Sequence, residues 1–192
     1  MEQEKAARKV ILFNMMTVDG LFEGPGHDLN WHNTDQAFED FAIEQLDTAD
    51  TLIFGRVTYE MMASFWSSSF AMKIDPLVAE RMNRLPKLVF SHTLARADWQ
   101  NTRLVKGDPV AEITRLKNEP GGNLFVFGSA NLSATLITQD MIDEFRVIIN
   151  PLILGSGTPL FQGITERIQL QLIYSRIFSN GNVLLFYQLL GR

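Results

Sequence analysis

The chain has 192 residues, of which 46% are apolar and 20% are charged, and it contains no cysteine. This length favours a single domain, and the lack of cysteine excludes a disulfide framework, a thiolate nucleophile and a cysteine metal site. The 17 basic and 22 acidic residues give a net charge of −5, which argues against a broad basic face that binds nucleic acid.

The sequence gives no support for a metal site, a membrane span or a targeting signal. The three histidines stand at 27, 32 and 92, which is too scattered for a histidine metal site, so no metal is expected. The apolar runs are too short to span a bilayer, and residues 1–9 lack the apolar segment of a signal peptide. We therefore expect a cytoplasmic protein with a mobile head at 1–8 and one domain over 9–192.

Short apolar runs alternate with helical patterns through most of the chain. In chain order, they predict a strand at 10–13, a long loop at 17–34, a helix at 35–47, a strand at 51–54, a helix at 57–65, a strand at 87–90, a helix at 108–117, a strand at 124–127 and a helix that ends near 137. Such alternation is typical of an α/β fold with a mostly parallel sheet and helices on both faces.

The last quarter of the chain has a different pattern. Runs of β type cover 145–154 and 168–174, and Asn180-Gly181 separates the apolar runs 176–178 and 183–190. Asn-Gly between apolar runs is a strong hairpin signal. We therefore predict a three-layer α/β fold with a mixed sheet that ends in an antiparallel C-terminal hairpin.

Two predicted strands end at small residues that lead directly into a helix: Gly55-Arg56-Val57-Thr58 and Gly128-Ser129-Ala130-Asn131-Leu132. A helix N-terminus built this way leaves N–H groups free to bind phosphate, and the Arg56 guanidinium suits a terminal phosphate. The alternatives are a turn that needs glycine for its backbone angles and an exposed arginine on a first helical turn. A third strand end, Ser91-His92-Thr93, adds polar groups where α/β sheets bind ligands, or is an ordinary polar loop.

Several motifs in a fixed order accompany these strand ends. They are Thr17-Val18-Asp19-Gly20, the run Leu52 to Glu60, the segment Trp99 to Val105 with Leu116-Lys117, the run Phe127 to Leu132, Asp143-Glu144, and the run Pro151 to Phe161. With them, the chain from about Lys9 to Leu190 resembles the dihydrofolate-reductase-like superfamily. It is most similar to the stand-alone relatives of the reductase domain of bacterial riboflavin biosynthesis. This resemblance implies hydride transfer from NADPH to a small heterocycle, a pterin or a pyrimidine-like compound.

The resemblance also implies which residues bind NADPH: Met15, Met16, Phe22, Gly55, Arg56, Thr58, Ser91, His92, Thr93, Gly128, Ser129, Ala130, Asn131 and Leu132. Within this set, Gly55, Arg56 and Thr58 would hold the adenosine-side phosphates, and residues 128–132 would hold the pyrophosphate. Ser91, with His92 or Thr93, would contact the 2′-phosphate or the adenosine. The backbone near Met15 and Met16, together with Phe22, would meet the nicotinamide.

On the substrate side, the resemblance implies Asn14, Trp31 and Asp35. Asp35 stands near the acidic residue that dihydrofolate reductases carry after their Trp-containing loop, which makes it the candidate catalytic residue. Its alternative role is to cap the helix at 35–47. A competing function is a non-catalytic nucleotide-binding or interaction protein on the same scaffold. The resemblance also suggests a homodimer, in which the apolar C-terminal strands form either the interface or the domain core.

Overall fold

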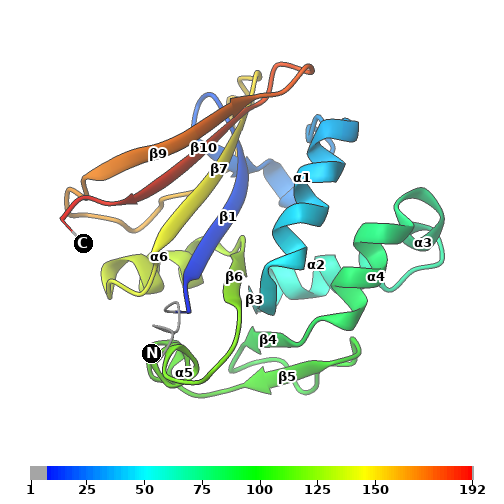
Figure 1. Cartoon of the computed structure of the whole chain (residues 1–192), viewed down its shortest axis with the longest axis vertical. Coiled ribbons are helices and arrows are strands. Elements are labelled where there is room, and N and C mark those ends of the chain that lie inside the picture. Colours follow the sequence, from blue (N-terminus) through cyan, green and yellow to red (C-terminus); the bar gives the residue numbers. More distant parts are fainter. Residues whose placement is uncertain (1–7, 192) are drawn as a thin grey trace, which may run out of the picture.

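The computed structural model describes residues 8–191, which form a central sheet with helices on both sides (Figure 1). The strands are β1 (Val10–Thr17), β2 (Leu21–Glu23), β3 (Ala49–Gly55), β4 (Lys87–Phe90), β5 (Thr102–Val105), β6 (Asn123–Phe127), β7 (Glu144–Asn150), β8 (Thr158–Pro159), β9 (Leu170–Ile177) and β10 (Val183–Leu189). The helices are α1 (Gln36–Asp47), α2 (Arg56–Trp66), α3 (Ala71–Ile74), α4 (Pro76–Arg84), α5 (Pro109–Lys117) and α6 (Ala130–Thr138).

The main sheet has eight strands in the order β5-β4-β3-β6-β1-β7-β10-β9. Neighbouring strands from β5 to β7 are parallel, whereas β10 pairs antiparallel with both β7 and β9. Parallel neighbours need crossover connections, which contain helices except between β4 and β5. The predicted α/β fold with a mostly parallel sheet and an antiparallel C-terminal hairpin is confirmed.

Alternation along β1 divides the core into two layers. Ile11 and Phe13 belong to one apolar cluster, which includes residues of α1, α2 and α4. Val10 and Leu12 belong to the other, which includes residues of α5 and α6. Because successive side chains of a strand point to opposite faces, an unbroken apolar run such as 10–13 requires cover on both sides.

Some elements differ from the sequence-based expectation. The predicted loop at 17–34 contains the short strand β2, which pairs with β8, and a 3-10 helix at Pro25–His27. Two strand predictions, at 168–174 and 176–178, merge into the single strand β9. Helices α3 and α4 and strand β5 were not predicted. Among residues 8–191, no helix has both the length and the apolar character that crossing a bilayer requires.

Residues 1–7 of the predicted mobile head lie outside the described residues, but Arg8 does not. Its guanidinium is buried, donates to the carbonyls of Gly122 at 2.8 Å and Leu116 at 3.0 Å, and forms an ion pair with Asp50. Arg8, which the sequence assigns to the head, is thus bonded to Gly122 just before β6, to Leu116 in α5 and to Asp50 in β3.

Candidate functional site

The carboxyl ends of four strands meet at one edge of the sheet. Gly55 of β3 lies opposite Phe90 of β4, and Phe127 of β6 pairs with both Phe54 and Phe13. The turns that follow β3, β4 and β6 therefore lie side by side. This is the edge at which parallel α/β sheets bind ligands, and the structure brings the three predicted junctions together there.

Two glycines allow the junctions after β3 and β6 to touch. A Cβ atom at Gly55 would lie 2.1 Å from the Ser129 hydroxyl oxygen and 2.8 Å from Ser129 Cβ. A Cβ atom at Gly128 would lie 3.1 Å from Thr58 Oγ1 and 3.7 Å from Asn14 Oδ1. Gly128 also has a φ of 53°, in the left-handed region that favours glycine. The interpretation of Gly128 as a requirement of a tight turn is confirmed, whereas Gly55 has an extended backbone and is needed only for the close approach of Ser129.

The helices that begin at this contact lack the caps that the other long helices have. Asp35, Asp75 and Asp108 accept hydrogen bonds from backbone N–H groups at the starts of α1, α4 and α5. The N-cap residues of α2 and α6, Gly55 and Ser129, make no such side-chain bond, and neither first turn contains an acidic residue. Two helix N-termini therefore direct free donors and the positive ends of their dipoles into one place.

The end of β1 has an open backbone edge next to this junction. Pairing of β1 with β6 stops at Phe13, whereas pairing with β7 continues to Thr17. Residues 14–17 thus have no strand on the β6 side within the described part of the chain. Met15 is buried in the α1-side core, and Met16 lies at intermediate depth. A ligand can therefore approach the backbone of this segment from the β6 side.

Of the predicted adenosine-side residues, Arg56, His92 and Thr93 are exposed, Ser91 is half-buried, and Gly55 and Thr58 are buried. Arg56, the first residue of α2, forms an ion pair with Glu60 at 2.7 Å between Nη1 and Oε2. After β4, the Ser91 hydroxyl accepts from the N–H groups of Thr93 and Leu94, while the side chains of His92 and Thr93 are exposed. These bonds of Ser91 shape the turn after β4. Arg56 places a cation at the N-terminus of α2.

The remaining predicted cofactor residues divide into buried and exposed ones. Ala130 and Leu132 are buried in the first turn of α6, where they pack the helix onto the sheet. Asn131 is exposed, and its Oδ1 accepts from Gln162 at 3.4 Å. Phe22 lies in β2, half-buried, on the segment that pairs with β8. Of these residues, only the exposed or half-buried ones have side chains with surface open to a ligand.

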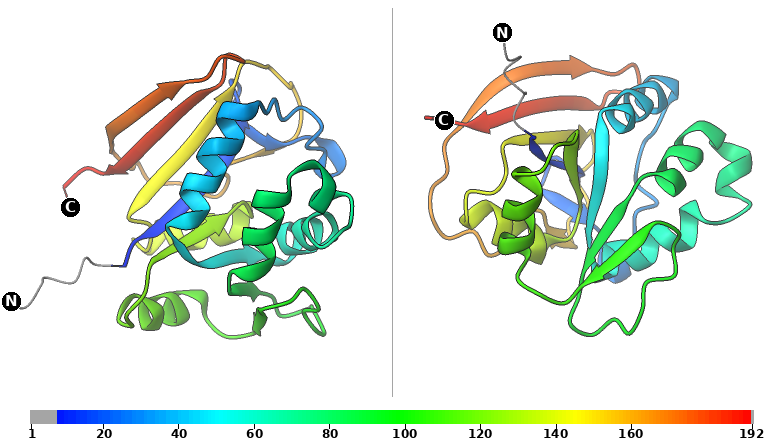
Figure 2. Two further views of the ribbon diagram at one scale, coloured as in Figure 1. Left: turned by 45° about the vertical axis from the view of Figure 1, so that its right-hand side comes forward. Right: turned by 60° about the horizontal axis from the view of Figure 1, so that its bottom comes forward.

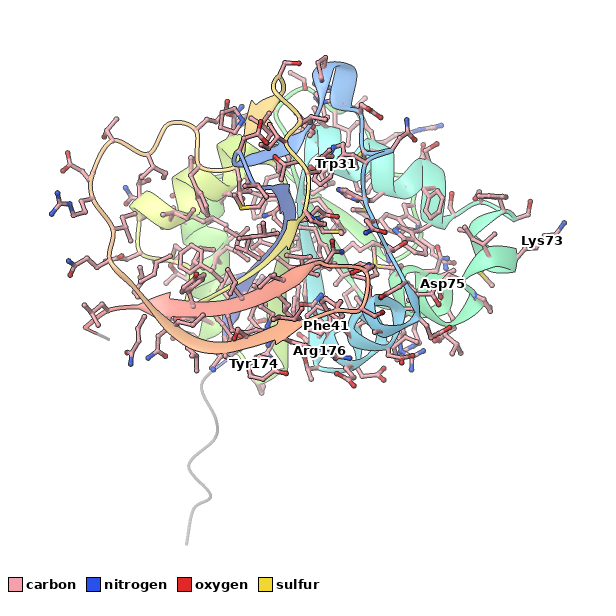
Figure 3. All side chains as sticks on the ribbon, turned by 90° about the horizontal axis from the view of Figure 1, so that it is seen from above. Trp31, Phe41, Lys73, Asp75, Tyr174 and Arg176 are labelled. Atoms are coloured by element: carbon pink, nitrogen blue, oxygen red, sulfur yellow. The ribbon has the colours of Figure 1, made fainter. Side chains whose placement is uncertain are left out.

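The predicted substrate-side residues Trp31 and Asp35 lie in the segment that leads into α1 (Figure 3 labels Trp31). The Trp31 indole donates to the carbonyl of Asp28 at 3.1 Å and packs against the α1-side core. Asp35 accepts from the N–H of Phe38 at 2.9 Å and from the Ser179 hydroxyl at 2.9 Å. These hydrogen bonds lower the pKa of Asp35. Its capping role is confirmed, and its catalytic role stays a prediction.

An asparagine network fixes this segment to the C-terminal hairpin. The N–H of Asn33 donates to Asn150 Oδ1 at 3.1 Å, and Asn33 and Asn180 exchange side-chain-to-backbone bonds at 3.1 and 2.9 Å. Asn182 Nδ2 also donates to the carbonyl of Asn33 at 2.5 Å. In both views of Figure 2 the β9–β10 turn lies beside α1. Sequence reasoning missed these contacts, although Asn180-Gly181 marked the turn.

The Asp-Gly motif after β1 has a structural role in this protein. Asp19 accepts from the Thr17 hydroxyl at 2.6 Å and from the N–H groups of Leu154 and Gly155 at 3.1 and 2.8 Å. These bonds, first of all that from Thr17, lower the pKa of Asp19 to about 2. Asp19 thereby joins the loop after β1 to the loop after β7, which together flank the open end of β1.

His32, in the segment before α1, has a buried ring nitrogen. Burial lowers its pKa from 6.5 to about 4, against the opposing charge of Asp28. Its Nε2 atom is buried without a hydrogen-bond partner among those residues, and its ring packs edge-on against Trp31. His32 is therefore neutral near pH 7 and adds no positive charge to the site.

Comparisons with known proteins agree with this geometry. A family model of the RibD C-terminal domain matches residues 8–184. The uncharacterized protein YyaP of Bacillus subtilis (strain 168) is 32% identical over 186 residues, which cover 94% of each chain. A putative riboflavin biosynthesis protein from Shewanella sp. PV-4 has a similar structure, with a TM-score of 0.72, 24% identity and coverage of 94% of this chain and 98% of that chain. Dihydrofolate reductase from Enterococcus faecalis, solved with NADP(H), has a TM-score of 0.63 at 15% identity, over 95% of this chain and 96% of that chain.

Proposed function

Because the chain belongs to the RibD C-terminal domain family, we propose that it is an NADPH-dependent reductase that transfers a hydride to a small heterocycle of the pterin or pyrimidine class. The observation that carries this proposal is the contact of two uncapped helix N-termini at Gly55 and Gly128. Free N–H groups and the positive ends of two helix dipoles form an anion site that suits a pyrophosphate.

The residues at the junction fit a dinucleotide. Side chains at Gly55 and Gly128 would fill the space in which the two turns approach each other, and a pyrophosphate needs that close approach to backbone. Arg56 lies at the start of α2, where it would contact a terminal phosphate, and residues 91–93 are polar at the next strand end. Each group has the charge or the donors that phosphate and ribose oxygens require.

NADPH would supply the hydride, and the chain would supply binding and orientation. The open backbone edge of residues 14–17 would hold the carboxamide of the nicotinamide and so fix the face that meets the substrate. Trp31, packed against the same core cluster as Met15, would exclude water from the reacting atoms. Asp35 would organise the proton that the substrate takes up, either directly or through one water.

The competing proposal is a nucleotide-binding protein without turnover. One observation favours it: both carboxylate oxygens of Asp35 already accept hydrogen bonds, from Phe38 and Ser179. A carboxylate held in this way has a lowered pKa, so it is ionised at neutral pH and has no proton to donate. The two proposals differ in turnover, whereas both require dinucleotide binding.

Turnover is tested by following NADPH oxidation at 340 nm with a panel of pterins, pyrimidine precursors of flavins and quinonoid compounds. The reductase proposal predicts oxidation that depends on enzyme and on at least one heterocycle. Saturable NADPH binding with no oxidation by any member supports the non-catalytic protein instead.

The Asp35→Asn variant separates the two roles of Asp35. Asparagine caps helices about as well as aspartate, so the melting temperature should change little. If Asp35 organises the proton, kcat should fall by about tenfold or more, with a smaller change in the Kd for NADPH. Unchanged kcat at every pH would leave Asp35 with its capping role alone.

We also propose that the protein is a homodimer that associates through β9. This strand is last in the sheet order and carries the exposed apolar side chains Leu172, Ile173, Tyr174 and Ile177, of which Ile177 is 78% exposed. Apolar side chains on an unpaired edge strand are typical of an interaction surface. A second copy provides an identical edge, as a two-fold axis requires.

A further inference from the structure

Asn14 has an unused buried donor beside the proposed pyrophosphate turn. The residue is 5% exposed, and its Nδ2 atom is buried with no hydrogen-bond partner among residues 8–191. Its Oδ1 atom lies 3.7 Å from the position of a Cβ on Gly128, next to Thr58. The amide therefore lies behind the turn that joins β6 to α6.

An unpaired amide in this position lowers stability. A buried donor without a partner costs about 1–3 kcal/mol, whereas an apolar side chain of the same shape has no such cost. The neighbouring inward positions of β1 on this face, Val10 and Leu12, are apolar and fully buried. Asn14, the next inward position, is polar and lies where the strands end. Such a departure from the apolar pattern of a buried strand is typical of functional sites.

A flip of the amide would direct the donor toward the ligand. The two ends of an asparagine amide have nearly the same shape, so a half-turn about the last side-chain bond exchanges Oδ1 and Nδ2 without repacking. The flipped amide would present its N–H groups to the Gly128 turn. A phosphate oxygen in that turn would stabilise the flipped state, because hydrogen bonds to charged acceptors are the stronger ones.

We propose that Asn14 is a cofactor-binding residue whose Nδ2 donates to the pyrophosphate of the dinucleotide at the Gly128 turn. This assignment rests on the proposed function, and it places Asn14 on the cofactor rather than the substrate. The side chain adds a neutral donor from the sheet to those of the two helices, and so holds the phosphate from a third direction.

The test measures binding and stability of Asn14→Leu by calorimetric titration and thermal unfolding. Leucine has a similar size and no donor, so the melting temperature should stay the same or rise while the Kd for NADPH increases by about tenfold or more. The Kd for ADP-ribose, which has the pyrophosphate but no nicotinamide, should increase by a similar factor. Asn14→Asp should weaken binding of both ligands further, because it adds a negative charge beside the phosphates.

Thr102→Val is the matched control. Thr102 Oγ1 is also buried without a partner in the described chain. However, Thr102 is the first residue of β5 and so lies at the amino ends of the parallel strands, away from the proposed site. Its replacement should leave both Kd values unchanged. Wild-type affinity in the Asn14 variants would overturn the assignment, and a loss confined to NADPH would overturn the pyrophosphate contact. If the wild-type protein bound neither ligand, the proposed function itself would fail.

Discussion

At the scale of single residues, the side chain at the N-cap decides whether a helix of this protein is closed or open to a ligand. Asp35, Asp75 and Asp108 each satisfy a first-turn N–H group of their helix. Gly55 and Ser129 do not, and they are the two N-caps that touch each other. An aspartate at either position would occupy the donors and repel a phosphate, so the small residues keep the anion site available.

Arg56→Ala tests the choice of cofactor. The Arg56–Glu60 pair is exposed, and such pairs contribute little to stability, so a phosphate can displace Glu60. We expect the variant to lose about tenfold in affinity for NADPH with little change for NADH, which lacks the 2′-phosphate. Titrations of both cofactors measure the ratio, and Glu60→Ala is the control, in which NADPH affinity is kept or raised. An unchanged ratio in Arg56→Ala would refute the assignment.

His32 should make stability depend on pH in the mildly acidic range. The unfolded chain protonates this histidine as pH falls through about 6.5, whereas the folded protein resists protonation until about pH 4. The free energy of unfolding should therefore decrease as pH falls between these values, by up to about 1.4 kcal/mol per pH unit for one proton.

Urea unfolding of the wild type, His32→Asn and His92→Asn measures this contribution. His92 is exposed, so its variant controls for the loss of a surface histidine, and only His32→Asn is expected to flatten the slope. Equal slopes in all three proteins would show that burial of His32 has no energetic consequence.

At the scale of elements, the strands and helices that the sequence predicts are those marked by a short local pattern, such as an apolar run or an Asp-Pro pair. The runs at 51–54, 87–90 and 124–127 lie within β3, β4 and β6, because three or four apolar residues in a row require cover on both faces. Asp108-Pro109 marked α5, and the same pair, Asp75-Pro76, begins the unpredicted helix α4. Helix α4 has four apolar residues besides its proline, as α5 does, so the same signal was present there.

A substitution that creates a steric overlap, and a second one that relieves it, test the contact between the turns after β3 and β6. In Gly55→Ala the new methyl would overlap the Ser129 side chain, and we expect a loss of about 1–3 kcal/mol in stability and weaker NADPH binding. Ser129→Gly removes the overlapping atoms, so the double variant should recover most of both losses.

The control for this pair is Gly107→Ala, whose new Cβ would have no atom within 4 Å. Chemical unfolding and NADPH titration of the four variants give the coupling between the two positions. Additive effects in the double variant would mean that the two turns do not depend on each other.

At the scale of the whole molecule, the candidate site combines segments that lie far apart in the sequence. The three strand-end junctions could be predicted to meet, since parallel strands end at one edge. The contacts of Asn33 with Asn180 and of Asp35 with Ser179 could not, because they join residues 147 and 144 positions apart. They depend on the antiparallel return of β9 and β10, which places the hairpin turn beside α1.

The proposed dimer is a property of the whole molecule as well. Ile177→Lys puts a charge on the β9 edge, and we expect light scattering to show a change from dimer to monomer. Leu77→Lys, at an exposed site of α4 away from β9, should keep the wild-type mass; Figure 3 shows the α3–α4 end, labelled at Lys73 and Asp75, far from Tyr174. A wild-type monomer, or a dimer that survives Ile177→Lys, would rule out this interface.

The central claim is that two uncapped helix N-termini form a dinucleotide site at one edge of the sheet. Calorimetric titration of the purified wild-type protein with NADPH tests it most directly. The account predicts saturable binding of one NADPH per chain with a Kd of about micromolar or lower. No binding at millimolar NADPH would contradict it.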